Sequence, residues 1–205
     1  MIEPIFIKSF FIIVVVLFLI GMFAPMVKIK KKGNDPHITH NGASLLTRLT
    51  PIAIFPWVIY IILFIIDNAI ILQFLAFKLL ISDYWIILGI IIIFFGLLLD
   101  FLGTAALGSN FRIDLPKEET TLITTGIYRL MRNPIVIGVY LLVFGSFLII
   151  PTMISLIFLI ANIITFNSKV RNEERFLAIR FGEEFEKYSK KVGRYTPFSL
   201  RKNKG

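Results

Sequence analysis

The chain has 205 residues, of which 57% are hydrophobic and 17% are charged, with a mean hydropathy of +0.83. Soluble domains carry about 25% charged residues, so this composition excludes a disordered chain and argues against a water-soluble globule. Cysteine is absent, which excludes disulfides, thiolate catalysis and cysteine-ligated metal centres. The net charge of +9 would suggest nucleic-acid binding on a soluble fold, but on so apolar a chain it indicates the cytoplasmic face of a membrane protein.

Long apolar runs predict an all-α integral membrane protein with about five transmembrane helices. The last run, 133–168, holds 36 residues without a charge. As one helix it would be about 54 Å long, against a hydrocarbon core of about 30 Å. It must therefore fold back, and Pro151 marks the corner of a tight helical hairpin. The expected spans are 5–25, 51–67, 85–104, 135–150 and 152–168, and the shorter apolar run 69–80 is read as interfacial or as an extension of the second span.

Basic residues between the spans set the predicted orientation. Lysine and arginine concentrate in the segments 26–50 and 104–134, and eleven of them follow residue 168. The positive-inside rule then places the N-terminus on the extracytosolic side and the C-terminus in the cytosol. The two long polar segments, 104–134 and 169–205, share the cytosolic face, so chemistry on water-soluble reagents is expected there.

The third span carries two further features. Gly89, Gly96 and Gly103 recur at a spacing of seven, which predicts a stripe for close helix packing in preference to a ligand site. Asp100, near the end of this span, is a candidate functional residue by its position, with simple hydration at the interface as the alternative. The two histidines lie three residues apart in the first loop without a third ligand, so no metal site is predicted.

A first polar block, 122–134, precedes the hairpin. Gly126 supplies a flexible turn, and Arg132 places a fixed cation directly before a span. Pro134 opens a helix whose positive N-terminus suits a carboxylate or a similar anion. The block could equally be an interfacial anchor.

A second polar block, 169–177, follows the hairpin. Its paired carboxylates, Glu173 and Glu174, could hold a cationic group, or they could form a solvated ion-pair network with the neighbouring basic residues. Beyond it, apolar residues at helical spacing predict an amphipathic cytosolic helix that lies on the bilayer or covers a pocket. These residues are Leu177, Phe181, Phe185 and Tyr188.

Together the blocks resemble the isoprenylcysteine carboxyl methyltransferase family and its phospholipid methyltransferase relatives. The run Gly126–Ile127–Tyr128…Arg132–Asn133–Pro134…Gly138 is similar to the family's G-x-Y…R-H-P-x-Y-x-G block. The segment from Glu173 to Pro197 is similar to its E-E…F-G-x-E-Y…Y…R-x-x-P run. The resemblance covers about residues 100–200. Asn133 stands where the family has His, and Val136 where it has an aromatic residue.

The resemblance implies S-adenosylmethionine as cofactor and a lipophilic or prenylated carboxylate as acceptor, with no nucleic acid or metal involved. The chain would form one membrane domain, 1–205, with N-terminal spans in 1–100 and the cofactor-binding and catalytic region in 101–205. Glu173 and Glu174 would face the cationic groups of the cofactor, and Arg132 would bind a carboxylate. The implied cofactor-binding residues are Gly126, Ile127, Tyr128, Arg132, Asn133, Pro134, Glu173 and Glu174, and the candidate catalytic residues are Arg132, Glu174 and Arg171.

Such a reaction requires little acid–base catalysis by the protein. A carboxylate acceptor is ionised at pH 7 and a sulfonium donor is already activated, so alignment, desolvation and charge balance suffice. Two alternatives remain open from the sequence. One is an NADPH-dependent membrane reductase of the sterol reductase type, which has a similar R-H-P…Y signature, and the other is a non-catalytic membrane protein that retains the fold.

Overall fold

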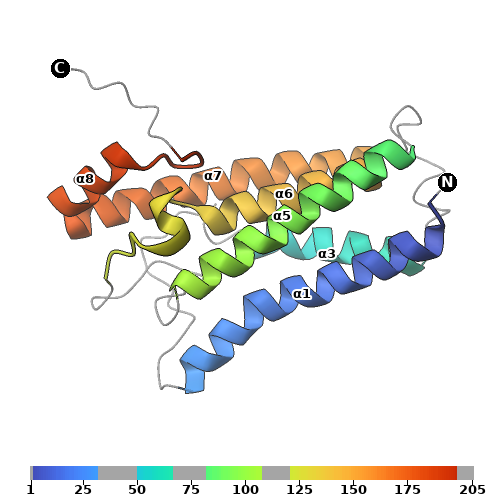
Figure 1. The fold of residues 1–205 in the computed structure, drawn as a ribbon, viewed down its shortest axis with the longest axis horizontal. Coiled ribbons are helices and arrows are strands. Elements are labelled where there is room, and N and C mark those ends of the chain that lie inside the picture. The colour runs from blue at the N-terminus through green and yellow to red at the C-terminus, as the bar shows by residue number, and fades with distance from the viewer. Residues whose placement is uncertain (1, 32–49, 67–81, 108–120, 198–205) are drawn as a thin grey trace.

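The computed structural model describes residues 2–31, 50–66, 82–107 and 121–197, and the expected all-α membrane fold is confirmed (Figure 1). The elements are α1 (Pro4–Lys31), α3 (Thr50–Ile66), α5 (Asp83–Leu107), the 3₁₀ turn η3 (Gly126–Arg129), α6 (Pro134–Ile149), α7 (Met153–Phe181) and α8 (Glu183–Lys191). The apolar run 69–80 and both histidines lie outside the described residues.

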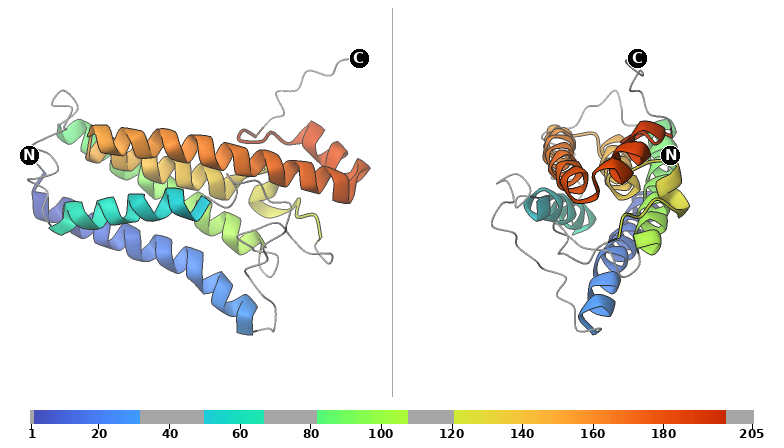
Figure 2. Two further views of the ribbon diagram at one scale, coloured as in Figure 1. Left: turned by 180° about the vertical axis from the view of Figure 1, so that it is seen from behind. Right: turned by 90° about the vertical axis from the view of Figure 1, so that its left-hand side faces the viewer.

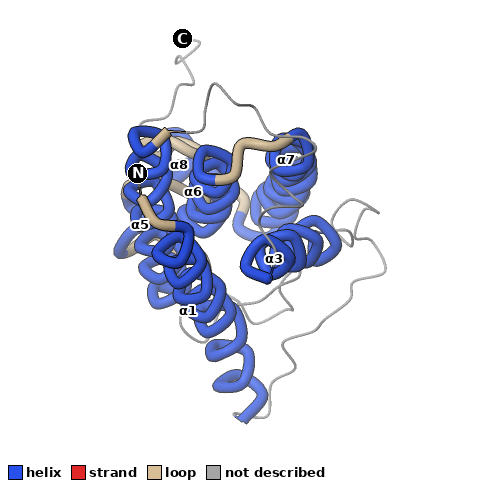
Figure 3. Tube along the Cα trace, turned by 90° about the vertical axis from the view of Figure 1, so that its right-hand side faces the viewer, coloured by secondary structure: helices blue, strands red, loops and turns tan. Residues whose placement is uncertain are grey.

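Among the described residues, five apolar helices alternate in direction along the chain. They close a ring in the order α1, α5, α6, α7, α3, in which the neighbours α1 and α5 run in the same direction (Figure 3). The pairing of α1 with α3 shows the antiparallel arrangement. The rings of Phe11 and Phe64 lie 5.9 Å apart, and those of Phe18 and Trp57 lie 5.7 Å apart, so sequence numbers rise along one helix as they fall along the other. Buried aromatic and branched side chains from all five helices fill the centre of the ring.

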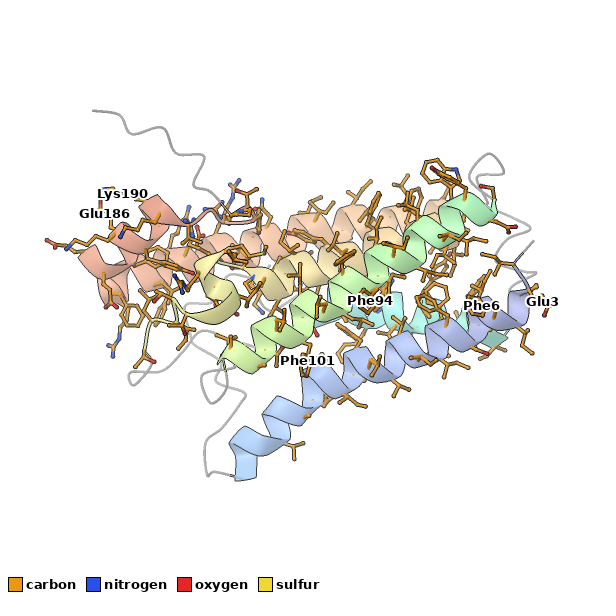
Figure 4. The ribbon with its side chains drawn as sticks, in the orientation of Figure 1. Glu3, Phe6, Phe94, Phe101, Glu186 and Lys190 are labelled. Atoms are coloured by element: carbon orange, nitrogen blue, oxygen red, sulfur yellow. The ribbon has the colours of Figure 1, made fainter. Side chains whose placement is uncertain are left out.

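The chain is a multi-pass membrane protein. The segments Pro4–Ala24, Asp83–Leu107 and Met153–Phe181 are long and apolar enough to cross a membrane, and the shorter apolar helices Ile54–Ile66 and Pro134–Ile149 lie beside them. Large apolar side chains cover the outside of the bundle, where Phe94 and Phe101 of α5 are 62% and 66% exposed (Figure 4). Each expected span falls on one apolar helix, but the last of these helices continues well past residue 168.

The predicted glycine stripe of α5 is the seam between α5 and α6. A Cβ atom added to Gly96 would lie 2.9 Å from the carbonyl oxygen of Gly138, and one added to Gly145 would lie 2.7 Å from that of Gly89. Such distances are shorter than van der Waals contact, so both helices need glycine at these crossings. The partner glycines on α6, Gly138 and Gly145, are also seven residues apart. The pairing of the two helices in the structure identifies them as the other half of the seam.

Pro151 forms the corner of the hairpin, as expected. Thr152 caps α7 by accepting a hydrogen bond from the backbone N–H of Ser155, and the Ser155 side chain accepts one from the Thr152 N–H. The hydroxyl groups of Tyr60 and Thr152 share a hydrogen bond of 2.6 Å, which ties the corner to α3. The N–H of Ile2 donates to Asp83 Oδ1 at 2.8 Å and so fixes the start of the chain to the start of α5.

At the other end of the bundle, α7 stops at Gly182 and α8 folds back beside it (Figure 2). Gly182 has φ +50°, a conformation that side chains rarely adopt. The single amphipathic helix expected around residues 177–188 is therefore corrected: Leu177 and Phe181 belong to α7, and α8 is the amphipathic helix. Phe185 of α8 is only 6% exposed, so α8 packs against the rest of the protein through this side chain.

Candidate functional site

Four segments meet at the polar end of the bundle: residues 121–133 with η3, the start of α6, the C-terminal part of α7, and α8 with the residues after it. We call residues 192–197 the C-terminal strap. The strap returns along α7 toward the start of α6 (Figure 2). Residues far apart in sequence therefore share one site.

Gly126 starts the η3 turn with φ +59°, as its predicted role as a flexible turn requires. A Cβ atom added there would lie 3.5 Å from Ala106, so the turn rests against α5. Tyr128 is 8% exposed, and its carbonyl oxygen accepts a hydrogen bond of 2.7 Å from the hydroxyl of Tyr188. The turn is thereby fixed to both α5 and α8.

Arg132 joins the other segments. Its Nε and Nη2 atoms donate to Glu174 Oε1 at 2.9 and 2.7 Å, and its Nη1 donates to the carbonyl oxygens of Ser189 at 2.9 Å and Val192 at 2.6 Å. Its backbone N–H donates to the carbonyl oxygen of Gly193 at 3.0 Å. A guanidinium has five N–H donors, so the protein itself occupies four of them.

Glu174 lies between two arginines. Its Oε1 accepts from Arg132, and its Oε2 accepts from Arg194 Nε at 2.9 Å and from Arg194 Nη2. The side chains of Arg132 and Glu174 are each 12% exposed, and that of Arg194 is 35% exposed. We call these three residues the polar clamp. Asn133 adds a longer bond of 3.3 Å from its Nδ2 to the carbonyl oxygen of Arg194.

Burial and the clamp set the charge states around the site. Burial raises the pKa of Tyr188 to about 12, although the nearby Arg132 opposes the shift. Burial also raises the pKa of Tyr128, and the charge of Glu173 adds to this effect. The hydrogen bond to Glu174 raises the pKa of Arg194. At neutral pH the two tyrosines are therefore neutral and Arg194 is fully charged.

A cavity of about 1040 Å³ lies between α7, α8 and the strap. Ligand pockets commonly measure about 300–1,000 Å³, so this cavity lies at the upper end of that range. Arg171 and Arg175 form its α7 wall, Phe185 lines it from α8, and Tyr195 lines it from the strap. The Tyr195 hydroxyl donates to Asn167 Oδ1 at 3.1 Å, which holds that wall in place.

The structure divides the predicted site residues into two groups. Arg132, Glu174 and Arg171 line the cavity together. The others do not line it within the described part of the chain: Gly126, Ile127, Tyr128, Asn133, Pro134 and Glu173. Glu173 instead lies where its charge acts on Tyr128, on the η3 side of the junction.

One expectation changes with this geometry, and two contacting residues were not foreseen. Glu174 does not form an ion-pair network with its sequence neighbours, because its partners come from the start of α6 and from the strap. Sequence reasoning did not single out Arg194 or Ser189. The only sequence signal for Arg194 was its place in the R-x-x-P run.

Comparison with known proteins assigns a family to the part of the chain that builds this site. Residues 84–184, about half of the chain, match the family model described as phospholipid methyltransferase. A protein-S-isoprenylcysteine O-methyltransferase from Xenopus laevis is 29% identical over 116 residues, which are 55% of this chain and 40% of that protein.

Two further relatives agree. A probable protein-S-isoprenylcysteine O-methyltransferase from Oryza sativa subsp. indica is 30% identical over 124 residues, or 57% of this chain and 64% of that protein. A protein-S-isoprenylcysteine O-methyltransferase from Dictyostelium discoideum is 31% identical over 115 residues, or 54% of this chain and 48% of that protein. The matched region thus spans less than two thirds of each relative. The resemblance is confirmed, and the α5–α8 part of the chain belongs to the family of the isoprenylcysteine carboxyl methyltransferases and their phospholipid methyltransferase relatives.

Proposed function

We propose that the chain is an S-adenosylmethionine-dependent membrane methyltransferase that acts on a lipophilic acceptor with a carboxylate, such as a prenylated cysteine. One observation carries the proposal: the family match over residues 84–184 coincides with α5, α6, α7 and the start of α8, which build the polar end of the bundle. The matched relatives are named as methyltransferases of isoprenylcysteine, which supports this acceptor class.

The residues around the cavity suit the cofactor. S-adenosylmethionine supplies a methyl group that is already activated on a sulfonium, and it also carries an ammonium, a carboxylate and an adenine ring. The cavity is lined by the carboxylates of Glu183 and Glu186 and by the rings of Phe185 and Tyr195. Carboxylates compensate cationic groups, and aromatic rings provide flat apolar surface for a base.

Within this proposal the polar clamp positions the site. Arg132 and Glu174 already satisfy most of each other's hydrogen-bonding capacity, so we assign them to holding the strap and α8 against α6. Arg171 does not take part in the polar clamp, so its guanidinium group can contact a ligand. The η3 turn, which contains Gly126, Ile127 and Tyr128, supports α8 through the hydrogen bond from the Tyr188 hydroxyl to the Tyr128 carbonyl oxygen. The start of α6 is anchored by Asn133 and Pro134.

The proposed orientation puts the cavity at the cytosolic face. The N-terminus and the polar end of the bundle lie at opposite ends of the molecule (Figure 1). With an extracytosolic N-terminus, as the positive-inside rule predicts, the cavity, α8 and the C-terminus face the cytosol. The lipid part of the acceptor would then reach the site from the adjacent leaflet.

Methyl transfer tests the function directly. The full chain in proteoliposomes receives S-adenosylmethionine with a radiolabelled methyl group and S-farnesylcysteine with a free carboxylate. We expect a base-labile methyl ester on the free acid and none on the same compound supplied as its methyl ester. Transfer only to phosphatidylethanolamine would reject the carboxylate acceptor, and no transfer to any acceptor would favour the non-catalytic alternative.

Ligand-dependent stability separates the methyltransferase from the reductase. S-adenosylhomocysteine at 100 times its Kd should stabilise the folded protein by about 2.7 kcal/mol. We expect NADPH to leave the thermal midpoint unchanged. Stabilisation by NADPH alone would favour the reductase over the methyltransferase.

Thiol labelling tests the orientation, because the chain has no native cysteine. In sealed vesicles, Ile2→Cys and Ser199→Cys should react with a membrane-impermeant reagent from opposite sides. Reaction of both from the same side would reject an odd number of crossings.

A further inference from the structure

Asp100 of α5 is a carboxylate inside the bundle, toward its polar end. It is 7% exposed, whereas the next residue, Phe101, points outward and is 66% exposed (Figure 4). Among the described residues, none donates a hydrogen bond to Asp100 or forms an ion pair with it. Burying an ionised carboxylate without a partner is costly, so an acidic residue at such a place is a candidate for a functional site.

Glycines leave the space around this carboxylate open. A Cβ atom added to Gly21 of α1 would lie 3.0 Å from Asp100 Oδ2, and one added to Gly138 of α6 would lie 3.2 Å from the Asp100 Cβ atom. A side chain at Gly21 would therefore stand directly against the carboxylate oxygen. The helices α1, α5 and α6 thus meet around Asp100, and neither glycine places a side chain against it.

Two further ionisable groups lie on the same side of the bundle. Burial is the main cause that raises the pKa of Tyr128, and the charges of Glu173 and Asp100 add to it, so both carboxylates lie near the Tyr128 hydroxyl. We call Asp100, Tyr128 and Glu173 the acidic junction. Lys169, one helical turn before Glu173, offsets part of the charge of Glu173. No described cation acts on Asp100, so the uncompensated negative charge is centred there.

The chemistry of the acidic junction favours a weakly hydrated cation. A carboxylate attracts positive charge, and a phenol ring adds a cation–π attraction. An ammonium group has three N–H donors that need acceptors, and among the described residues no group of three possible ligands could hold a metal ion. A sulfonium has no N–H or O–H group to satisfy, so one carboxylate within apolar surroundings is sufficient for it.

Tyr188 connects the acidic junction to the cavity. Its hydroxyl donates to the Tyr128 carbonyl oxygen at 2.7 Å. The charges of Arg132 and Glu174, which line the cavity, act on the same hydroxyl. The junction and the cavity therefore lie on the two sides of one layer of side chains. Tyr128 and Glu173, which the family resemblance implies for cofactor binding, lie on the Asp100 side of this layer.

We propose that Asp100 is the counter-ion of the cofactor's sulfonium and makes the site selective for S-adenosylmethionine over S-adenosylhomocysteine. The inference rests on the proposed methyltransferase function and adds to it a residue from the interior of the bundle. Methyl transfer breaks the S–CH3 bond, returns its electron pair to sulfur and joins the methyl group to the acceptor oxygen, so the sulfur becomes neutral. Asp100 then no longer attracts it, which favours release of S-adenosylhomocysteine.

Calorimetry on the full chain in nonionic detergent at neutral pH tests this role. The measured quantity is the Kd of S-adenosylhomocysteine divided by the Kd of S-adenosylmethionine. We expect a ratio of about ten or more for the wild type. Asp100→Asn keeps the size of the side chain and should lower the ratio about tenfold, mainly by weakening S-adenosylmethionine. The control Glu184→Gln removes an exposed carboxylate outside the cavity and should keep the wild-type ratio.

A second variant protects the test against a folding defect. Gly21→Ala places a methyl group against Asp100 Oδ2 and should lower the same ratio. If Asp100→Asn does not fold, an unchanged ratio in Gly21→Ala overturns the inference.

The remaining outcomes separate this inference from the proposed function. A wild type that binds S-adenosylhomocysteine as tightly as S-adenosylmethionine overturns the role of Asp100 alone. So does an unchanged ratio in Asp100→Asn, whether both affinities are retained or both fall equally. A wild type that binds neither ligand rejects the proposed function itself, and the inference with it.

Discussion

The seam between α5 and α6 and the polar clamp hold the protein together by opposite means. In the seam, Gly96 and Gly138 bring two helix backbones into direct contact without a side chain between them. In the clamp, one carboxylate bridges two guanidinium groups, which also hold the backbone of the strap. Lipid tails are as apolar as leucine, so helices inside a membrane associate by shape. At the membrane surface water competes for polar groups, so the clamp has to be largely buried to be stable.

This difference predicts different sensitivities. The seam depends on volume, so it should respond to a single added methyl group and ignore salt. The clamp depends on charge, so it should tolerate changes of volume better than the loss of one carboxylate. The following variants test the contrast, from the largest expected effect to the smallest.

Glu174→Gln should have the largest effect. It leaves the guanidinium groups of Arg132 and Arg194 facing each other without the carboxylate between them. Removing one partner of a fully buried pair costs about 3–5 kcal/mol. Because Arg194 is 35% exposed, we expect a smaller loss, about 2–3 kcal/mol. Thermal unfolding in detergent measures it.

The control for this variant is Glu184→Gln, an exposed carboxylate in the first turn of α8. It should stay within about 0.5 kcal/mol of the wild type. Adding Arg194→Gln to Glu174→Gln should cost much less than the two single losses combined, because the second change removes an unbalanced charge. Strictly additive losses would mean that the two residues do not interact.

Gly138→Ala should destabilise the seam by about 2 kcal/mol, within the range for overpacking. Its Cβ atom would lie 2.8 Å from the carbonyl oxygen of Gly96, a backbone atom that cannot move without shifting a helix. The matched change Gly21→Ala meets only the side chain of Asp100, at 3.0 Å, and should cost less. Equal thermal midpoints for the two variants would contradict the close-packed seam.

Thr152→Val removes the polar cap at the hairpin corner. Loss of a helix N-cap costs about 0.5–2 kcal/mol, and here the hydroxyl of Tyr60 also loses its partner. We expect a loss of about 1–2 kcal/mol by thermal unfolding. Thr152→Ser keeps the hydroxyl group and should remain close to the wild type. A serine variant as unstable as the valine variant would contradict the assignment, because it would show that the hydroxyl group alone does not stabilise the corner.

Tyr188→Phe should have the smallest effect, about 1 kcal/mol for one hydrogen bond. Because burial raises the pKa of Tyr188 from 10.0 to about 12, the unfolded chain loses this proton at a lower pH than the folded protein. The contribution of Tyr188 is therefore complete below pH 10 and disappears as the pH rises toward 12. Unfolding midpoints measured from pH 8 to 12 should fall less steeply in Tyr188→Phe than in the wild type, and identical slopes would contradict the assignment.

The sequence by itself determined the helices and their order. Unbroken apolar runs of membrane length specify helices, because backbone groups in lipid must be satisfied within the segment. Pro151 marked the corner for a local reason, since proline cannot continue a helix. Spacing alone also identified the α5 stripe of Gly89, Gly96 and Gly103 as a packing surface.

Only the tertiary structure decided how the polar residues pair. Glu174 had Arg171 and Arg175 within one helical turn, yet it binds Arg132, 42 residues away, and Arg194, 20 residues away. Any of these guanidinium groups satisfies a carboxylate equally well in principle, so sequence neighbours alone do not decide between them. The fold of α8 and the strap brings Arg194 to one oxygen of Glu174 and Arg132 to the other, and it leaves Arg171 and Arg175 facing the cavity.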